Sequence, residues 1–152
     1  MYERLKSTDD SRIIDSTSGW FFSDKSDVVS HHVYFRSPKL SADAERPYVL
    51  SEFCGYSYRV DGHLFGSKNY GYSKHKTLRE FEKSVLDLYE NDVRTLVENG
   101  ISALIYTQLS DIEDETNGFV TYDRKVLKID AARIKKILSE LFKISTNEVT
   151  QK

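Results

Sequence analysis

Three segments of the sequence have the residue types of buried strands, and an amphipathic helix lies between the second and the third. The segments cover residues 27–35, 47–53 and 102–108, which are rich in β-branched and aromatic residues and show little polar alternation. Strands of that kind are covered on both faces, as in parallel sheets that are connected by helices. The pattern predicts an α/β fold with a parallel sheet.

The helix between the second and third segments has defined ends. Thr77 and Glu80 form a T-x-x-E capping box, in which the hydroxyl accepts from the amide three residues on and the glutamate reaches back. Apolar residues then recur at helical spacing, and Asn99-Gly100 supplies a left-handed stop. A second amphipathic helix is predicted near the C-terminus, with an apolar stripe of Ile134, Ile137, Leu138, Leu141 and Phe142.

Shorter segments complete the predicted organisation. Residues 2–6 are typical of the end of a helix and residues 12–15 of a short strand, which brings the strands to about four. Two long loops, 55–76 and 109–123, follow strands, and loops of such length are often functional. We expect one folded domain over residues 1–144 and a polar tail over residues 145–152.

Composition disfavours several classes of function. The formal net charge is −2, which gives no bulk attraction to nucleic acid or to an anionic membrane. The apolar runs are far shorter than the ~20 residues of a membrane span. The first residues show no secretory signal pattern and the single Cys54 allows no internal disulfide, so the cytoplasm is the expected compartment. No cluster has zinc-ligand spacing, so neither a metal nor a cofactor is expected.

The carboxyl ends of the predicted strands are where a ligand would bind in a parallel α/β fold. Glu52 is the sharpest candidate, because an ionisable group that closes an apolar strand must be solvated in a cleft or strongly hydrogen-bonded. Its alternative role is a structural carboxylate paired with a neighbouring Arg or His, and spacing alone favours neither. The other polar groups at strand ends are Asp15 with Trp20, His32 with Tyr34, and Gln108 with Asp111 and Glu113.

Each of these secondary candidates also has a structural interpretation. A histidine within a strand, such as His32, is more often a structural group than a catalytic one. Trp20 could stack on a sugar ring, although covering the core is the favoured interpretation. The tyrosines of the first long loop suit hydroxyl-rich ligands and equally suit a protein interface. The acidic residues after the last strand lack the glycine-punctuated pattern of a calcium loop, so most are expected to be solvated.

Three stretches of the sequence carry a resemblance to a known family. They are DSTSGW with DVVSHHVY (residues 15–20 and 27–34), RPYVLSEFCG (46–55), and ALIYTQLSDIE with the following NG and TYDR (103–113, 117–118 and 121–124). Through them, residues 5–130 resemble the C-terminal part of the catalytic barrel of glycoside hydrolase family 2, the family of β-galactosidases, β-glucuronidases and β-mannosidases. Tyr56 departs from the pattern, since some members have a second glycine there.

The resemblance implies a partial (β/α)8 TIM barrel that contains strands five to eight with their helices. The family's nucleophile is the glutamate that closes the seventh strand, and this catalytic role falls on Glu52. It also implies a set of substrate-binding groups near the sugar, which are Trp20, His32, Tyr34, Gln108 and Asp111. Because a nucleophile must remain charged, we expect donors such as His32 or Tyr34 to hydrogen-bond Glu52.

The resemblance further indicates what is missing. Family members place an acid/base glutamate after an asparagine at the end of the fourth strand, whereas the Asn147-Glu148 pair lies in the polar tail. A full barrel takes about 250 residues. We therefore expect a fragment of a retaining β-glycosidase that acts weakly or not at all on its carbohydrate substrate. The alternatives are a half-barrel completed by a partner chain or by self-association, and a non-catalytic carbohydrate-binding or interaction module.

Overall fold

A three-stranded parallel sheet lies at the centre of the computed structural model, which describes residues 1–17, 19–34 and 45–149. The strands are β1 (Val29–Val33), β2 (Tyr48–Cys54) and β3 (Ala103–Thr107), and they pair in the order β1-β2-β3. Each is slightly shorter than its predicted segment or shifted by one residue. The predicted α/β class and the parallel pairing are confirmed.

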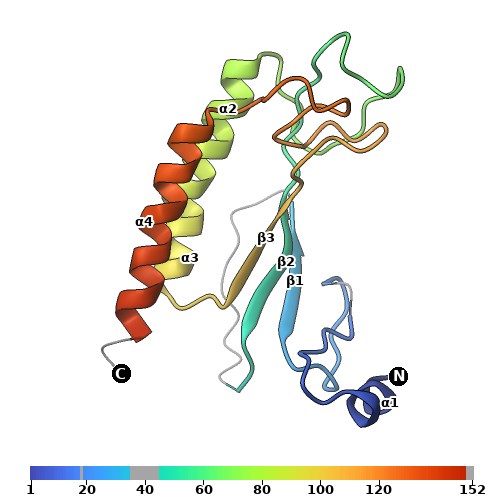
Figure 1. Cartoon of the computed structure of the whole chain (residues 1–152), viewed down its shortest axis with the longest axis vertical. Coiled ribbons are helices and arrows are strands. Elements are labelled where there is room, and N and C mark those ends of the chain that lie inside the picture. Colours follow the sequence, from blue (N-terminus) through green and yellow to red (C-terminus); the bar gives the residue numbers. More distant parts are fainter. Residues whose placement is uncertain (18, 35–44, 150–152) are drawn as a thin grey trace.

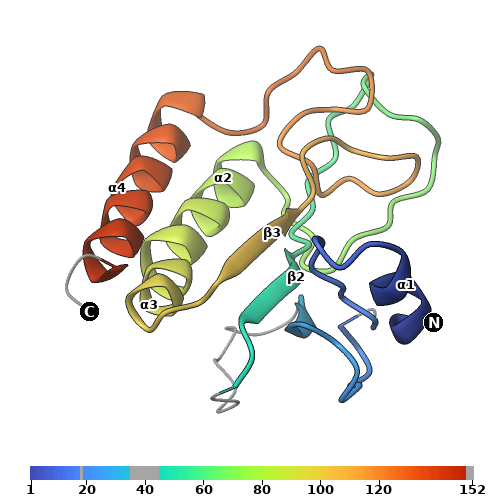
Figure 2. The same cartoon turned by 60° about the horizontal axis from the view of Figure 1, so that its bottom comes forward.

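The helices lie on both sides of this sheet. Figures 1 and 2 show α2 (Leu78–Asp87), α3 (Arg94–Glu98) and α4 (Ala131–Val149) along one side, and α1 (Tyr2–Thr8) on the other. A π-helical turn, η1 (Leu88–Val93), joins α2 to α3, so the predicted helix is continuous but not uniform. None of the helices in the described part of the chain combines the length and the apolar character that a membrane span requires.

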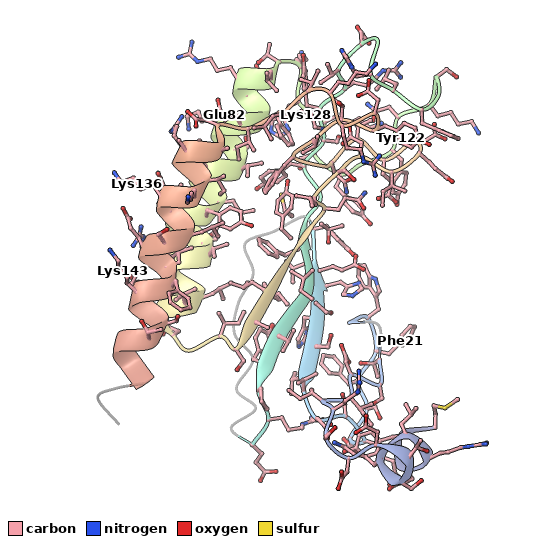
Figure 3. The ribbon with its side chains drawn as sticks, viewed as in Figure 1. Phe21, Glu82, Tyr122, Lys128, Lys136 and Lys143 are labelled. Atoms are coloured by element: carbon pink, nitrogen blue, oxygen red, sulfur yellow. The ribbon has the colours of Figure 1, made fainter. Side chains whose placement is uncertain are left out.

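The ends of these helices follow the sequence signals. Thr77 accepts a hydrogen bond from the amide of Glu80, and the Glu80 carboxylate accepts from the amide of Thr77, which confirms the capping box. On α4 the residues Ile134, Ile137 and Leu141 are buried, whereas Lys136 and Lys143 project from the outer side, as Figure 3 shows. The helix continues to Val149, so helical structure extends into the segment for which a polar tail was predicted.

The hydrophobic core lies between the sheet and α2–α4. Leu50 and Phe53 of β2 are fully buried there with Phe81, Val85 and Leu86 of α2. Phe53 also meets the rings of Tyr89 and Tyr106 edge-on. The contact with Tyr89 joins β2 to the helical segment η1, and the contact with Tyr106 joins β2 to β3, so burial of these rings stabilises both the sheet and the packing of the helices on it.

The alternation of β2 is interrupted between Leu50 and Phe53. Both side chains enter the core although they are three positions apart, and the pairing of β2 with both neighbours shifts at this point. Two residues, Ser51 and Glu52, therefore face away from the helices. Ser51 meets Ser30 of β1 with 2.6 Å between the hydroxyl oxygens, and Glu52 lies opposite His32. This β-bulge turns the carboxylate to the side of the sheet that faces away from α2–α4.

The predicted strand at residues 12–15 is wrong. Ile14 accepts one backbone hydrogen bond from Asp27 at 2.9 Å, but its own amide donates to the Asp27 carboxylate rather than to a strand. One backbone bond does not make a ladder, so the sheet has three strands in the described residues instead of about four. Phe35 and the loop over residues 37–44, for which the sequence suggested the end of a strand and a polar connection, lie outside the described residues.

Replacing Phe81 by Ala should lower the free energy of unfolding by about 3–5 kcal/mol, because a fully buried ring would leave a cavity. Phe21 gives a matched control, since the same change at its exposed ring should shift stability by at most ~0.5 kcal/mol. Chemical denaturation followed by circular dichroism measures both. Equal losses at the two positions would contradict the core described above.

Candidate functional site at the carboxyl end of the sheet

Glu52 stands at the carboxyl end of β2, with Tyr34 and His32 close to one of its oxygens. The Tyr34 hydroxyl donates a hydrogen bond to Oε2 of Glu52, as the sequence analysis expected. The Nδ1 atom of His32 lies 3.8 Å from the same oxygen and 3.2 Å from the Tyr34 hydroxyl. Because the Tyr34 proton goes to Glu52, the His32 Nδ1–H donates to Tyr34. The Glu52 side chain is nevertheless 41% exposed, so the carboxylate is anchored yet open to a ligand.

The surroundings of Tyr34 keep its hydroxyl protonated, so that it remains a hydrogen-bond donor. Burial of its ring, followed by the hydrogen bond to Glu52, raises the pKa of Tyr34 well above its ordinary value. Its ring is stacked on that of Tyr72, with 4.5 Å between centroids and 22° between planes. Gly55 leaves the space for this stack, because a Cβ at that position would lie 2.5 Å from Cδ2 of Tyr72. The orientation of the donor is thus fixed by both ends of the loop that follows β2, through Gly55 and Tyr72.

Trp20 lies beside the same cluster. Its ring centroid is 6.1 Å from that of His32 and 5.9 Å from that of Tyr34, while 57% of the residue is exposed. Gly19 allows this approach, since it has a φ of +72° and any Cβ would clash with the His32 ring. The core role that the sequence analysis favoured for Trp20 does not fit this exposure. An exposed indole next to an anchored carboxylate provides an apolar surface on which a sugar ring could stack.

Gln108 and Asp111, at the end of β3, are used inside the protein. The Gln108 amide donates to Oε2 of Glu115 at 3.1 Å and to Oδ1 of Asn117 at 2.9 Å, so it holds the loop after β3. Asp111 is buried and accepts from Lys128 Nζ at 2.7 Å and from the amide of Gly118 at 2.8 Å. A buried carboxylate cannot contact a sugar, so in this structure Asp111 has a structural role and not the predicted substrate-binding role.

Lys128 closes the inner end of this loop. Its ammonium group is fully buried, and it also donates to the backbone oxygens of Tyr58 and Thr116. Burial raises the pKa of Asp111 and lowers that of Lys128, and the contact between the opposite charges counteracts both shifts. Figure 3 shows Lys128 at the base of the loops, beside the top of α2. The pair therefore ties the loop after β3 to the loop after β2.

The tyrosines of the loop over residues 55–76 have different roles. Tyr56 and Tyr58 pack against the core, Tyr72 stacks on Tyr34, and Tyr70 is 54% exposed. The sequence analysis treated the four alike and missed Tyr72 and Glu115 as neighbours of the site. The spacing of Tyr70 and Tyr72, two positions apart, indicated that both rings could point to the same side of the loop. Which ring contacts Tyr34 depends on the path of the loop, which the sequence does not show.

The outer rim of the two loops is joined by a second contact, between a histidine and a carboxylate. Nδ1 of His63 lies 2.9 Å from Oδ2 of Asp123, and the Phe65 and Tyr122 rings meet edge-on beside it. The hydrogen bond from His63 lowers the pKa of Asp123 to about 2. In Figures 1 and 2 the two loops lie side by side beyond the ends of β2 and β3.

The comparisons with known proteins add no assignment to this geometry. No protein-family model matches the chain, and no curated protein matches it. Among the residues with described positions, no group of three His, Cys, Asp or Glu side chains is placed to hold a metal ion. Of the predicted site residues, Glu52, Tyr34, His32 and Trp20 come together, whereas Gln108 and Asp111 support the neighbouring loop.

Replacing Lys128 by Met should destabilise the fold by about 3–5 kcal/mol, because Asp111 would be left as an uncompensated buried charge. The exposed Lys136→Met on α4 is the matched control and should cost at most ~0.5 kcal/mol. The double variant Asp111→Asn with Lys128→Met should recover part of the loss. Urea unfolding measures all three, and a Lys128→Met variant as stable as Lys136→Met would refute the buried pair.

Titration of the Asp123 carboxyl by ¹³C NMR should give a pKa of about 2 in the wild type. The His63→Ala variant should raise this pKa, because the largest cause of the lowering is removed. Since the folded-state pKa is depressed, the contact stabilises the loops when the pH is above the ordinary Asp pKa of about 4. This stabilisation is lost as the pH falls toward 2. Lys125→Met, which removes a more distant cation, should change little. An unaltered pKa in His63→Ala would contradict the contact.

Proposed function

We propose that this chain is the C-terminal part of a retaining, β-glycosidase-like glycoside hydrolase barrel of family 2 type, with Glu52 as the nucleophile. The observation that carries the proposal is the state of Glu52, an accessible carboxylate at the carboxyl end of a parallel strand, fixed by a buried phenol and flanked by an exposed indole. Polar groups at the carboxyl ends of parallel strands are a recurrent feature of active sites in α/β folds.

The geometry suits attack on an anomeric carbon. Tyr34 and His32 both approach Oε2, and no hydrogen bond to Oε1 is found in the described part of the chain. In this mechanism Oε1 forms a bond to the anomeric carbon as the glycosidic C–O bond breaks, and the leaving oxygen takes a proton from an acid. Water then attacks the same carbon and gives its proton to the conjugate base of that acid, the bond to Oε1 breaks, and the configuration is retained.

Tyr34 would act on the charge of the nucleophile during these steps. Its hydrogen bond favours the ionised carboxylate in the free protein, and it weakens as Glu52 becomes an ester. The raised pKa of Tyr34 keeps the phenol protonated through both states. Trp20 would supply the apolar surface against which the sugar is held next to Glu52.

The mechanism also needs an acid/base. Among the described residues, no Asn-Glu pair fits the place that the family gives to this group. In the proposal it comes from elsewhere in a completed barrel, supplied by another segment, by a partner chain or by a second copy. In the described residues β1 and β3 each pair with β2 alone, which leaves an edge on either side for further strands. Without the acid, hydrolysis of unactivated glycosides should fall by roughly 10²–10⁴-fold.

A non-catalytic carbohydrate-binding module is the second candidate, and the exposed ring of Tyr70 favours it. Such a module needs an aromatic platform and polar groups but no nucleophile. The two candidates differ in one property, which is whether Glu52 becomes covalently bonded to the sugar.

Incubation with a panel of 2-deoxy-2-fluoro-β-glycosyl fluorides tests that property. Fluoride leaves without the help of an acid, so an adduct on Glu52 should accumulate even if the acid/base is absent. Peptide mass spectrometry should find the added mass on the peptide that contains Glu52. Glu52→Gln should abolish labelling, whereas Glu98→Gln, a change at an exposed position on α3, should leave it intact. Labelling that persists in Glu52→Gln, or no labelling by any member, would refute the nucleophile role.

A further inference from the structure

A hollow lies between the two rim loops, outside the cluster around Glu52. It has a volume of about 510 Å³. One wall comes from the loop after β2 and the other from the loop after β3, and the lining residues are Lys68, Asn69, Tyr70, Ile112, Glu113, Asp114 and Glu115. No role was assigned above to this hollow, which is large enough for one sugar unit.

The walls of the hollow are tied together by the protein itself. The backbone amide of Tyr70 donates to the backbone oxygen of Asp114 at 2.7 Å, and the backbone amide of Thr116 donates to the backbone oxygen of Tyr70 at 3.2 Å. The Thr116 hydroxyl also donates to Oδ1 of Asn69 at 2.8 Å. A preformed site of this kind loses little conformational entropy when a ligand binds.

An aromatic path connects the hollow to Glu52. The Tyr70 ring lies 6.0 Å from that of Tyr72, and Tyr72 is stacked on Tyr34, which donates to Glu52. Burial, followed by the hydrogen bond with Tyr70, raises the pKa of Tyr72 to about 12, so the Tyr72 phenol remains neutral. On the other wall, Glu115 is fixed by Gln108 at the end of β3. The hollow therefore lies next to the candidate site, along the rim formed by the two loops.

The lining indicates the chemistry of the ligand. Tyr70 offers an exposed ring for stacking. Three acidic residues line the hollow, Glu113, Asp114 and Glu115, and Lys68 is the one basic residue in its lining. Carboxylates accept hydrogen bonds from sugar hydroxyls and attract cations. They repel the carboxylate or sulfate of an acidic sugar.

We propose that this hollow is a second sugar subsite, which takes a sugar unit without negative charge and prefers one that carries an ammonium group. Its role as the subsite of a hydrolase rests on the function proposed above, with the first sugar beside Glu52 and Trp20 and the second unit beside Tyr70. Its preference among sugars rests on the hollow alone. The proposed ligands are therefore oligosaccharides whose second unit is a neutral or amino sugar.

Titration of the full chain with three disaccharides, followed by ¹⁵N NMR, tests the preference. The probes are a glucosamine dimer, cellobiose and a galacturonic acid dimer. At low salt the glucosamine dimer should bind most tightly and the galacturonic acid dimer least, with shifts at the amides of Tyr70 and Glu115. The difference between the two charged probes should shrink as salt screens the carboxylates. Equal binding of the two, or no shift at these amides with any probe, would overturn the proposal.

Two variants with matched controls locate the site. Tyr70→Ala should weaken binding of the glucosamine dimer by about threefold to tenfold, because a stacking ring is lost. Tyr122→Ala, a change on the same rim but outside the lining, should leave affinity unchanged. Glu113→Gln should reduce the advantage of the glucosamine dimer over cellobiose, whereas Glu98→Gln should not. Tyr70→Ala with unaltered affinity would overturn the assignment.

The two proposals fail in different ways. If Glu52 is labelled but no disaccharide binds at Tyr70, the hydrolase function stands and the second subsite is wrong. If the glucosamine dimer binds at Tyr70 but Glu52 is never labelled, the subsite stands and the chain is a binding module.

Discussion

The bulge in β2 determines which way Glu52 points, and the candidate site depends on it. In a strand with uninterrupted alternation, a residue two positions after Leu50 would enter the core and Phe53 would not. With the extra residue, Phe53 fills the core against Tyr89 and Tyr106, and Glu52 emerges beside His32 and Tyr34. An ionised carboxylate forced into that core would cost several kcal/mol, so packing and charge favour the same irregular register.

From this point the site is assembled by the loops that leave β2 and β3. Gly55 lets Tyr72 stack on Tyr34, and Tyr70 carries the same aromatic row to the outer hollow. The loops are joined at their base by the buried Lys128–Asp111 pair and at their outer rim by His63 and Asp123. The rigid strand ends and these ties explain how irregular loops can hold side chains in fixed positions around an open carboxylate.

Elements with strong local signals were predictable from the sequence, and features that depend on register were not. The Thr77–Glu80 capping box and the three parallel strands follow from periodicity and caps, and the structure has them. Of the predicted stripe on α4, Ile134, Ile137 and Leu141 are buried, whereas Leu138 and Phe142 are exposed. A period of two cannot show that Ser51 is an extra residue. Residues 12–15 have the composition of a strand, but composition does not supply a pairing partner. Asp111 was predicted to bind substrate because it follows β3. Its partner Lys128 is 17 positions further along the chain, and no local sequence signal indicates that the two side chains pair.

Azide rescue of Glu52→Gly is the most direct measurement of whether this carboxylate is the attacking group. Removing the side chain leaves room for azide, and dinitrophenyl β-glycosides carry a leaving group that needs no acid. The account predicts that azide restores cleavage of at least one such glycoside and that the product is the α-glycosyl azide, formed on the face that Glu52 would attack. A β-glycosyl azide, or no azide-dependent product from the whole panel, would contradict it.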